Sequence, residues 1–167
     1  LNEIGAVCAK AGKDVDACLQ EILDVAIEIS GADKGNIQLV DEESGALKMS
    51  AHRGFDPWFL DYFDTVLDGN SACGLALESK QRVIVEDVTK SEIFAGKSSL
   101  RVIREADVLA VQSLPLVSST GLVLGIISTH FSNTHRPTEQ EQRLMDLLAR
   151  RQQRRRKTRS ARGSARS

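Results

Sequence analysis

Residues 109–131 read LAVQSLPLVSSTGLVLGIISTHF, which is two apolar runs joined by a short polar segment. The joining segment, 118–121, ends in Gly121, and glycine adopts positive φ at low cost, so the pattern predicts a β-hairpin. The second run, 122–131, is apolar at successive rather than alternate positions, which is typical of a central strand covered on both faces. Pro115 lacks a backbone donor and therefore predicts a missing ladder bond near the end of the first strand.

Helices are predicted near both ends of the chain. Apolar residues recur at helical spacing within 15–30, with Asp14 as the N-cap and Gly31 as the residue after the helix. A second helix follows the sequence TEQE at 138–141, which has the capping-box pattern. Residues 1–11 carry an apolar stripe that is too short for an isolated helix, so we expect this segment to continue upstream or to pack against a second copy.

Shorter elements are predicted between the helix at 15–30 and the hairpin. Residues 36–41 and 47–52 alternate as two strands, and the second is apolar on one side only, as expected at a sheet edge. A further short strand is predicted at 82–85. Short helices are predicted after Ser71 and within 91–108.

Five of the seven aromatic residues lie within FDPWFLDYF, residues 55–63. Pro57 suits the first turn of a helix, and Asp56 precedes it as a cap. Four aromatic side chains then share one face by helical spacing: Phe55, Trp58, Phe59 and Tyr62. This face either closes over the sheet as part of the core or lines a small-molecule pocket as a lid, and the two roles are compatible.

The charge of the chain is unevenly distributed. Residues 150–167 hold nine of the 22 basic residues and no acidic one, which leaves residues 1–149 with 13 basic against 23 acidic groups and a formal charge of −10. Such a body does not attract nucleic acid by its own field. We therefore place a single domain at 1–150. The tail at 151–167 is predicted to be disordered, and its abrupt composition favours an artificial extension or an out-of-frame end over a natural contact with nucleic acid or acidic lipid.

Cysteine and histidine residues form no metal-binding or catalytic pattern. Cys8, Cys18 and Cys73 cannot all pair with one another, and their spacings predict neither a zinc site nor a disulfide framework. A reducing, cytoplasmic setting is the default expectation. His130 and His135 have no carboxylate or cysteine at triad or metal spacing. Because no apolar run reaches the roughly 20 residues that span a bilayer, we expect no membrane insertion.

In their order along the chain, these motifs resemble those of a GAF domain. The resemblance is carried by GNSACG at 69–74, VIVEDV at 83–88, FAG at 94–96, VQSLPL at 111–116 and GIISTH at 125–130. The form is most similar to the GAF modules of bacterial sensor histidine kinases, which belong to two-component systems, and of related signalling proteins. The resemblance implies an α+β fold of the GAF/PAS-like type. In this fold a mixed antiparallel sheet has the terminal helices on one face and a loop-and-helix lid over a pocket on the other.

The resemblance implies a sensory module that is not itself an enzyme. An unidentified small molecule would bind under the lid, and the terminal helices, at about 1–12 and 138–150, would form a homodimer and relay the change to an attached output domain. The segments that form the pocket in this family supply five candidate ligand-binding residues: Trp58, Tyr62, Cys73, Phe94 and Gln112. No cofactor is identified, and no specific nucleic-acid partner is expected.

Two other functions stay open at this point. One is a thiol-based redox sensor or reductase centred on Cys73, because the start of a helix lowers a thiol pKa. A few GAF proteins reduce free methionine sulfoxide with several lid cysteines, whereas here Cys73 is the one cysteine in the lid region. The other is a purely structural dimerisation domain. The signatures of cyclic-nucleotide binding and of bilin attachment in this family are absent from the sequence.

Overall fold

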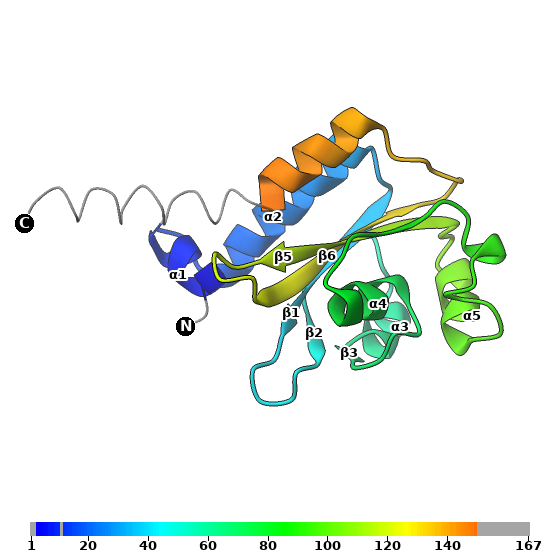
Figure 1. Cartoon of the computed structure of the whole chain (residues 1–167), viewed down its shortest axis with the longest axis horizontal. Coiled ribbons are helices and arrows are strands. Elements are labelled where there is room, and N and C mark those ends of the chain that lie inside the picture. The colour runs from blue at the N-terminus through cyan, green and yellow to red at the C-terminus, as the bar shows by residue number, and fades with distance from the viewer. Residues whose placement is uncertain (1–2, 11, 150–167) are drawn as a thin grey trace, which may run out of the picture.

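A computed structural model describes residues 3–10 and 12–149 and contains a curved sheet with a layer on each face (Figure 1). Six strands follow the order β3-β2-β1-β6-β5-β4, and every neighbouring pair is antiparallel. They are β1 (Lys34–Val40), β2 (Leu47–Arg53), β3 (Thr65–Val66), β4 (Val83–Val85), β5 (Ala110–Val117) and β6 (Val123–Phe131). The α+β class predicted from the sequence is confirmed. The predicted tail, 151–167, lies outside the described residues.

The predicted hairpin is the β5–β6 pair. Its register runs from Ala110 opposite Phe131 to Val117 opposite Val123, and nearly every residue of both strands is buried. Pro115 lies beyond the part of β5 that pairs with β4, because β4 reaches only to Ser113. The missing N–H of Pro115 therefore interrupts no ladder on the β4 side.

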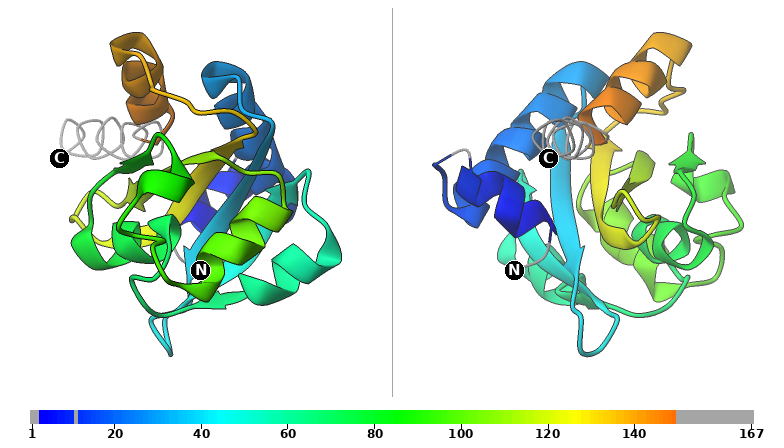
Figure 2. Two further views of the ribbon diagram at one scale, coloured as in Figure 1. Left: turned by 90° about the vertical axis from the view of Figure 1, so that its right-hand side faces the viewer. Right: turned by 60° about the vertical axis from the view of Figure 1, so that its left-hand side comes forward.

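Helices α1 (Glu3–Lys10), α2 (Val15–Ser30) and a helix at 139–149 lie on one face of the sheet (Figures 1 and 2). The ends of α2 are those predicted, since the Asp14 side chain accepts the N–H of Ala17 at 2.7 Å and Gly31 follows with φ of 68°. The buried core of this layer includes Ile4, Leu19, Leu23, Ala26, Ile127 and Met145.

The helix at 139–149 begins at a capped turn. The hydroxyl of Thr138 accepts the backbone N–H of Glu141 at 3.1 Å, which is the Thr138 half of the predicted capping box. The Glu141 carboxylate turns to the imidazole of His135, whose Nε2 lies 3.0 Å away. The His135 ring in turn stacks on Phe131, with 3.8 Å between centroids. This chain of contacts fixes the start of the helix to the end of β6.

The lid covers the opposite face (Figure 2). Its elements are α3 (Pro57–Tyr62), α4 (Ala72–Ser79), the 3₁₀ turn η1 (Val88–Lys90) and α5 (Ser98–Glu105). Tyr62 Oη lies 2.7 Å from Ser98 Oγ and joins α3 to α5, while Ser71 Oγ accepts the N–H of Gly74 and caps α4. Asp56 occupies the predicted N-cap position of α3, with Pro57 in the first turn, but within the described residues its side chain makes no capping hydrogen bond.

The structure corrects the prediction for two cysteines. Cys8 on α1 and Cys18 on α2 form a disulfide, with Cα atoms 5.7 Å apart. Gly12, at φ of 73°, lies in the turn that folds α1 back against α2 and so brings together two residues ten positions apart. Spacing alone did not indicate this pair, because the contact depends on the geometry of the turn. Cys73 is a free, buried thiol.

Candidate functional site

A small cavity lies between the lid and the central strands. The space open to a water molecule measures about 20 Å³, which is room for about one water. Strands β1, β5 and β6 form its floor, and the lid helices with the loop before α5 form its walls. The lining residues are Asn36, Phe59, Phe63, Ser71, Ala72, Cys73, Phe94, Ile103, Val111, Ser113, Ser128 and His130. We call this space the lid cavity.

Polar side chains form the floor of the lid cavity. Asn36 of β1 lies opposite Ser128 of β6, which lies opposite Ser113 of β5, so the three form one row across the sheet. The two serine hydroxyls are 2.7 Å apart and hydrogen-bond to each other. The Oδ1 atom of Asn36 is buried and has no hydrogen-bond partner within the described part of the chain. An unsatisfied buried group of this kind lowers the stability of the fold by about 1–3 kcal/mol. A further polar partner that bonds to Asn36 Oδ1 would remove this penalty.

His130 lies two residues along β6 from Ser128 and faces the same side of the sheet. The plane of its ring is nearly perpendicular to the rings of Phe55 and Phe59, with 4.9 and 6.2 Å between the ring centroids. Burial, with a smaller effect of the Lys34 charge, lowers the pKa of His130 from 6.5 to about 3, so the imidazole is neutral at physiological pH. Its Nδ1 atom is buried and meets no partner among residues 3–10 and 12–149.

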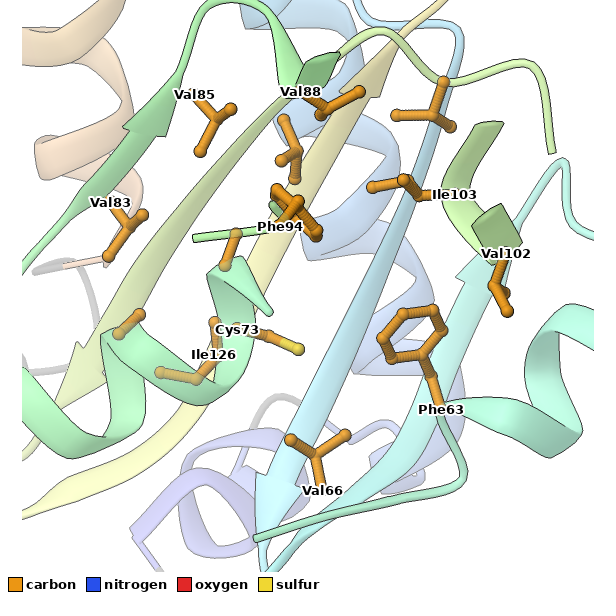
Figure 3. Close-up of a cluster of buried hydrophobic side chains, with 14 of the residues drawn as sticks. Phe63, Val66, Cys73, Val83, Val85, Val88, Phe94, Val102, Ile103 and Ile126 are labelled. Carbon is orange, nitrogen blue, oxygen red and sulfur yellow. The ribbon is translucent and has the colours of Figure 1, made fainter. Parts of the chain in front are cut away.

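Aromatic rings form the apolar walls of the lid cavity. Phe59 is almost fully buried, and its ring packs against those of Phe55 and Phe63 at 4.0 and 4.8 Å. Phe94 comes from the loop before α5 and is equally buried. Figure 3 shows Phe63, Cys73 and Phe94 approaching the same region from three separate segments of the lid. The cavity therefore combines a polar floor with ring-shaped apolar walls.

An open cleft of about 350 Å³ adjoins the lid cavity, and we call it the outer cleft. Tyr62, Asp68 and Lys97 are among its lining residues, so unlike the lid cavity it carries formal charges. Phe63 and Ser71 line both spaces and thus form the partition between them.

The five residues predicted for ligand binding are divided among different places. Cys73 and Phe94 line the lid cavity, and Tyr62 lines the outer cleft. Trp58 is 42% exposed and lines neither space. Gln112 neighbours Ser113 in β5 and so points to the opposite face, toward the terminal helices, where it is buried. Their participation in ligand binding stays a prediction.

The helix face predicted for the aromatic segment also differs from the structure. The residues turned inward are Phe55, Phe59 and Phe63, at four-residue spacing, whereas Trp58 and Tyr62 are each 42% exposed. The helix has only six residues, from Pro57 to Tyr62, so Phe55 lies before it and the predicted single face of Phe55, Trp58, Phe59 and Tyr62 does not form.

Sequence reasoning missed the polar floor. A signal was present, because Asn36, Ser113 and Ser128 interrupt strands that are otherwise rich in apolar residues. Whether these three residues face the same side depends on the register of β1, β6 and β5, and the pattern of a single strand does not give that register.

The thiol of Cys73 is poorly suited to nucleophilic chemistry. Burial raises its pKa, although the Ser71 hydroxyl, 3.2 Å from Sγ, acts in the opposite direction. The other two cysteines are bonded to each other on the far side of the sheet. Within the described residues, no group of three or more His, Cys, Asp or Glu side chains could hold a metal ion. No helix among them is long and apolar enough to cross a membrane.

Comparison with known proteins gives a family match over most of the chain. A family model described as GAF domain matches residues 12–151. No curated protein matches the chain significantly.

Solved structures with a similar fold include domains of signalling proteins and an enzyme. A domain assigned to a two-component sensor histidine kinase from Sinorhizobium meliloti 1021 has a TM-score of 0.69 and 21% identity, covering 91% of this chain and 97% of that one. The GAF domain of an Acinetobacter phosphoenolpyruvate-protein phosphotransferase has a TM-score of 0.66 and 17% identity, covering 82% and 78%. The free methionine-R-sulfoxide reductase of Neisseria meningitidis, in complex with its substrate, has a TM-score of 0.68 and 22% identity, covering 91% and 83%. At these identities the likeness concerns the fold alone.

Proposed function

Because this chain belongs to the GAF domain family, we propose that residues 1–150 form one non-catalytic sensory domain of a signalling protein, such as a sensor histidine kinase. The domain binds a small molecule in the lid cavity and passes the resulting change through its terminal helices to an attached output domain. The fold likeness to a domain of a sensor histidine kinase supports this proposal. The proposed location is still the cytoplasm, but the Cys8–Cys18 disulfide is of a kind that is rare there and removes the support that the cysteine pattern gave to this proposal.

One observation carries the ligand-binding proposal. Asn36 Oδ1 and His130 Nδ1 are buried at the floor of the lid cavity, and neither has a partner among the described residues. Native proteins pair nearly all such atoms with protein groups, ordered water or ligands, so two of them lining one small cavity mark a site for a further polar partner. A ligand with polar groups supplies that partner.

The sheet offers a route from the cavity to the terminal helices. Strands β1 and β6 carry the polar floor on one face and pack against α2 on the other. At the β4 edge of the sheet, Arg82, directly before β4, donates hydrogen bonds to Gln142 at 3.2 Å and pairs with Asp146 on the helix at 139–149. A ligand that binds two arrangements of these strands with different affinity shifts the population of both helices.

We propose that the helix at 139–149 and α2 supply the surface for the homodimer, whereas α1, predicted to take part in it, buries Ile4 and Cys8 in the core of its own chain. Val25 of α2 and Leu144 and Leu147 of the helix at 139–149 are large apolar side chains exposed to solvent. Both helices lie on the side of the sheet away from the lid (Figure 2). Exposed apolar side chains on two helices of one face fit a contact with a second copy.

The likeness to methionine sulfoxide reductases favours one alternative, a redox enzyme or sensor based on Cys73. Against it, burial raises the pKa of this thiol, and the cysteine pair of α1 and α2 lies on the other face of the sheet. A purely structural dimerisation domain is the other alternative, and it assigns no role to the polar floor of the lid cavity.

Thermal unfolding with a library of small metabolites tests the proposed function. A ligand that binds only the folded state raises the midpoint, because at a hundred times its Kd it stabilises the protein by about 2.7 kcal/mol. We expect a compound that stabilises the wild-type chain but not Asn36→Leu, while Thr129→Val, on the opposite face of β6, keeps the response. Stabilisation that is equal in wild type and Asn36→Leu, or a library without any stabilising compound, contradicts the proposal.

A further inference from the structure

We propose that the lid cavity takes an uncharged molecule with an apolar ring and a carboxamide- or lactam-type edge. This inference rests on the proposed function, because it names the class of ligand for the same site. Three features of the cavity carry it: the absence of charge in its lining, the unpaired polar row on its floor and the aromatic rings in its walls.

The described side chains that line the lid cavity carry no formal charge. None is Asp, Glu, Lys or Arg, and His130 is neutral because its pKa lies at about 3. The nearby cation Lys34 is already engaged, since its Nζ donates to the carbonyl of Ala106 and lies 5.8 Å from the centroid of the Phe55 ring. A charged ligand would lose its hydration here without gaining a counter-charge, which is a large cost.

The floor is complementary to a group that both donates and accepts. An Asn side chain presents a carbonyl oxygen and an NH₂ group side by side, and neutral imidazole donates at one ring nitrogen and accepts at the other. The open atoms are Asn36 Oδ1 and His130 Nδ1, with the Ser113–Ser128 hydroxyl pair beside Asn36 in the same row. A carboxamide or lactam edge has a donor next to an acceptor and pairs with such a floor.

The aromatic walls of the cavity favour a ligand that contains a planar ring. Phe59, Phe63 and Phe94 present rings to the space above the floor, and rings of this kind pack well against another planar ring. Phe63 and Ser71 separate the lid cavity from the outer cleft, so displacement of the Phe63 ring joins the two spaces. The lid cavity alone has room for about one water, so a ring enters it only when the Phe63 ring moves and the two spaces join, and any larger substituent then lies in the outer cleft.

Three compounds of nearly the same size and shape separate the charge classes: benzamide is neutral, benzoate is anionic and benzamidine is cationic. Each is titrated into the isotope-labelled full chain, and the NMR signals of Asn36, Ser128 and His130 are followed. We expect benzamide to shift these signals with an affinity at least about tenfold higher than either charged analogue, a difference of about 1.4 kcal/mol. Ser128→Ala and Asn36→Leu should weaken the binding of benzamide, and Thr129→Val should leave its affinity unchanged.

The possible results separate this inference from the proposed function. Benzoate or benzamidine bound at the same signals as tightly as benzamide overturns the inferred ligand class and leaves a ligand-binding cavity. Benzamide bound equally by wild type and Asn36→Leu also overturns it. If none of the three shifts the signals of the cavity at about 10 mM, where a millimolar Kd is detected, the inferred ring-containing ligand class fails, while the proposed function is still decided by the thermal-unfolding library.

Discussion

His130 is neutral inside the fold and exposed to water in the unfolded chain. Burial lowers its pKa from 6.5 to about 3 in the folded state. Between these two values the unfolded chain binds a proton that the folded chain does not, so the free energy of unfolding falls as the pH drops through this range. Between pH 7.5 and pH 5 this proton linkage lowers the free energy of unfolding by about 2 kcal/mol.

The replacement His130→Phe removes this contribution. Urea unfolding at the two pH values should show that the loss of stability on acidification is smaller in His130→Phe than in wild type by about 2 kcal/mol. His52→Gln, at a histidine that is exposed, is the matched control and should keep the wild-type loss. An unchanged loss in His130→Phe would show that this imidazole is not held neutral by the fold.

The buried thiol of Cys73 should react slowly in the native protein. Burial raises its pKa, so little thiolate forms at neutral pH, and the lid also shields the sulfur. We expect alkylation by iodoacetamide at neutral pH to be slower by about two orders of magnitude than in the urea-unfolded chain, as measured by mass spectrometry. Cys73→Ser should leave the sensitivity of the protein to peroxide unchanged. Rapid native labelling would revive the redox alternative.

Single residues of the site were only partly predictable. Phe94 and Cys73 were placed in the lid cavity by resemblance to the family, and the structure brings both to its wall. Gln112 was assigned to the lid cavity, but its neighbour Ser113 faces the cavity and Gln112 faces the opposite side of the sheet. In a strand that is apolar on both sides, the pattern does not show which face a polar residue takes. Asn36 was recognised as part of a strand, but its cross-strand neighbours were not.

At the level of elements, the disulfide between α1 and α2 makes a measurable prediction. It closes a loop of about ten residues, and such bonds stabilise small domains by typically 2–4 kcal/mol. The double replacement Cys8→Ser/Cys18→Ser should lower the free energy of unfolding by about this amount under oxidising conditions and by much less in the presence of a thiol reductant. Cys73→Ser, which removes the free cysteine, is the control. The same loss with and without reductant would mean that the two cysteines act by packing alone.

The elements with regular patterns were predicted well. The β5–β6 hairpin, α2 with its Asp14 cap, and the helix after Thr138 follow from apolar periodicity and capping residues. The lid was less predictable, because its helices are short and their orientation is set by contacts such as the hydroxyl pair of Tyr62 and Ser98. Strand β3 has two residues, which is too short for any periodic signal.

At the level of the whole molecule, the homodimer proposal depends on the exposed apolar side chains of the terminal helices. Leu147→Glu places a charge on this surface and should shift the full chain toward the monomer in analytical ultracentrifugation, without a change in the thermal midpoint of the monomer beyond a few degrees. Leu67→Glu, at an exposed leucine on the lid side, is the matched control and should leave the mass unchanged. A wild-type chain that sediments as a monomer at every concentration would contradict the proposal.

The layer arrangement of the whole molecule was predictable from one strand. Because the run at 122–131 is apolar on both faces, the sheet needed two covering layers, and the structure places the terminal helices on one face and the lid on the other. The size of the cavity between lid and sheet could not be predicted from the sequence, since a space of about 20 Å³ depends on the packing of a dozen side chains.

The central claim is that the lid cavity holds a small molecule, and native mass spectrometry of the full chain purified from cells tests it most directly. The account predicts wild-type protein that carries a small uncharged compound released on denaturation, and Asn36→Leu protein that lacks this mass. Thr129→Val should retain the compound. Wild type and Asn36→Leu with identical masses, both equal to the bare polypeptide, would contradict the account.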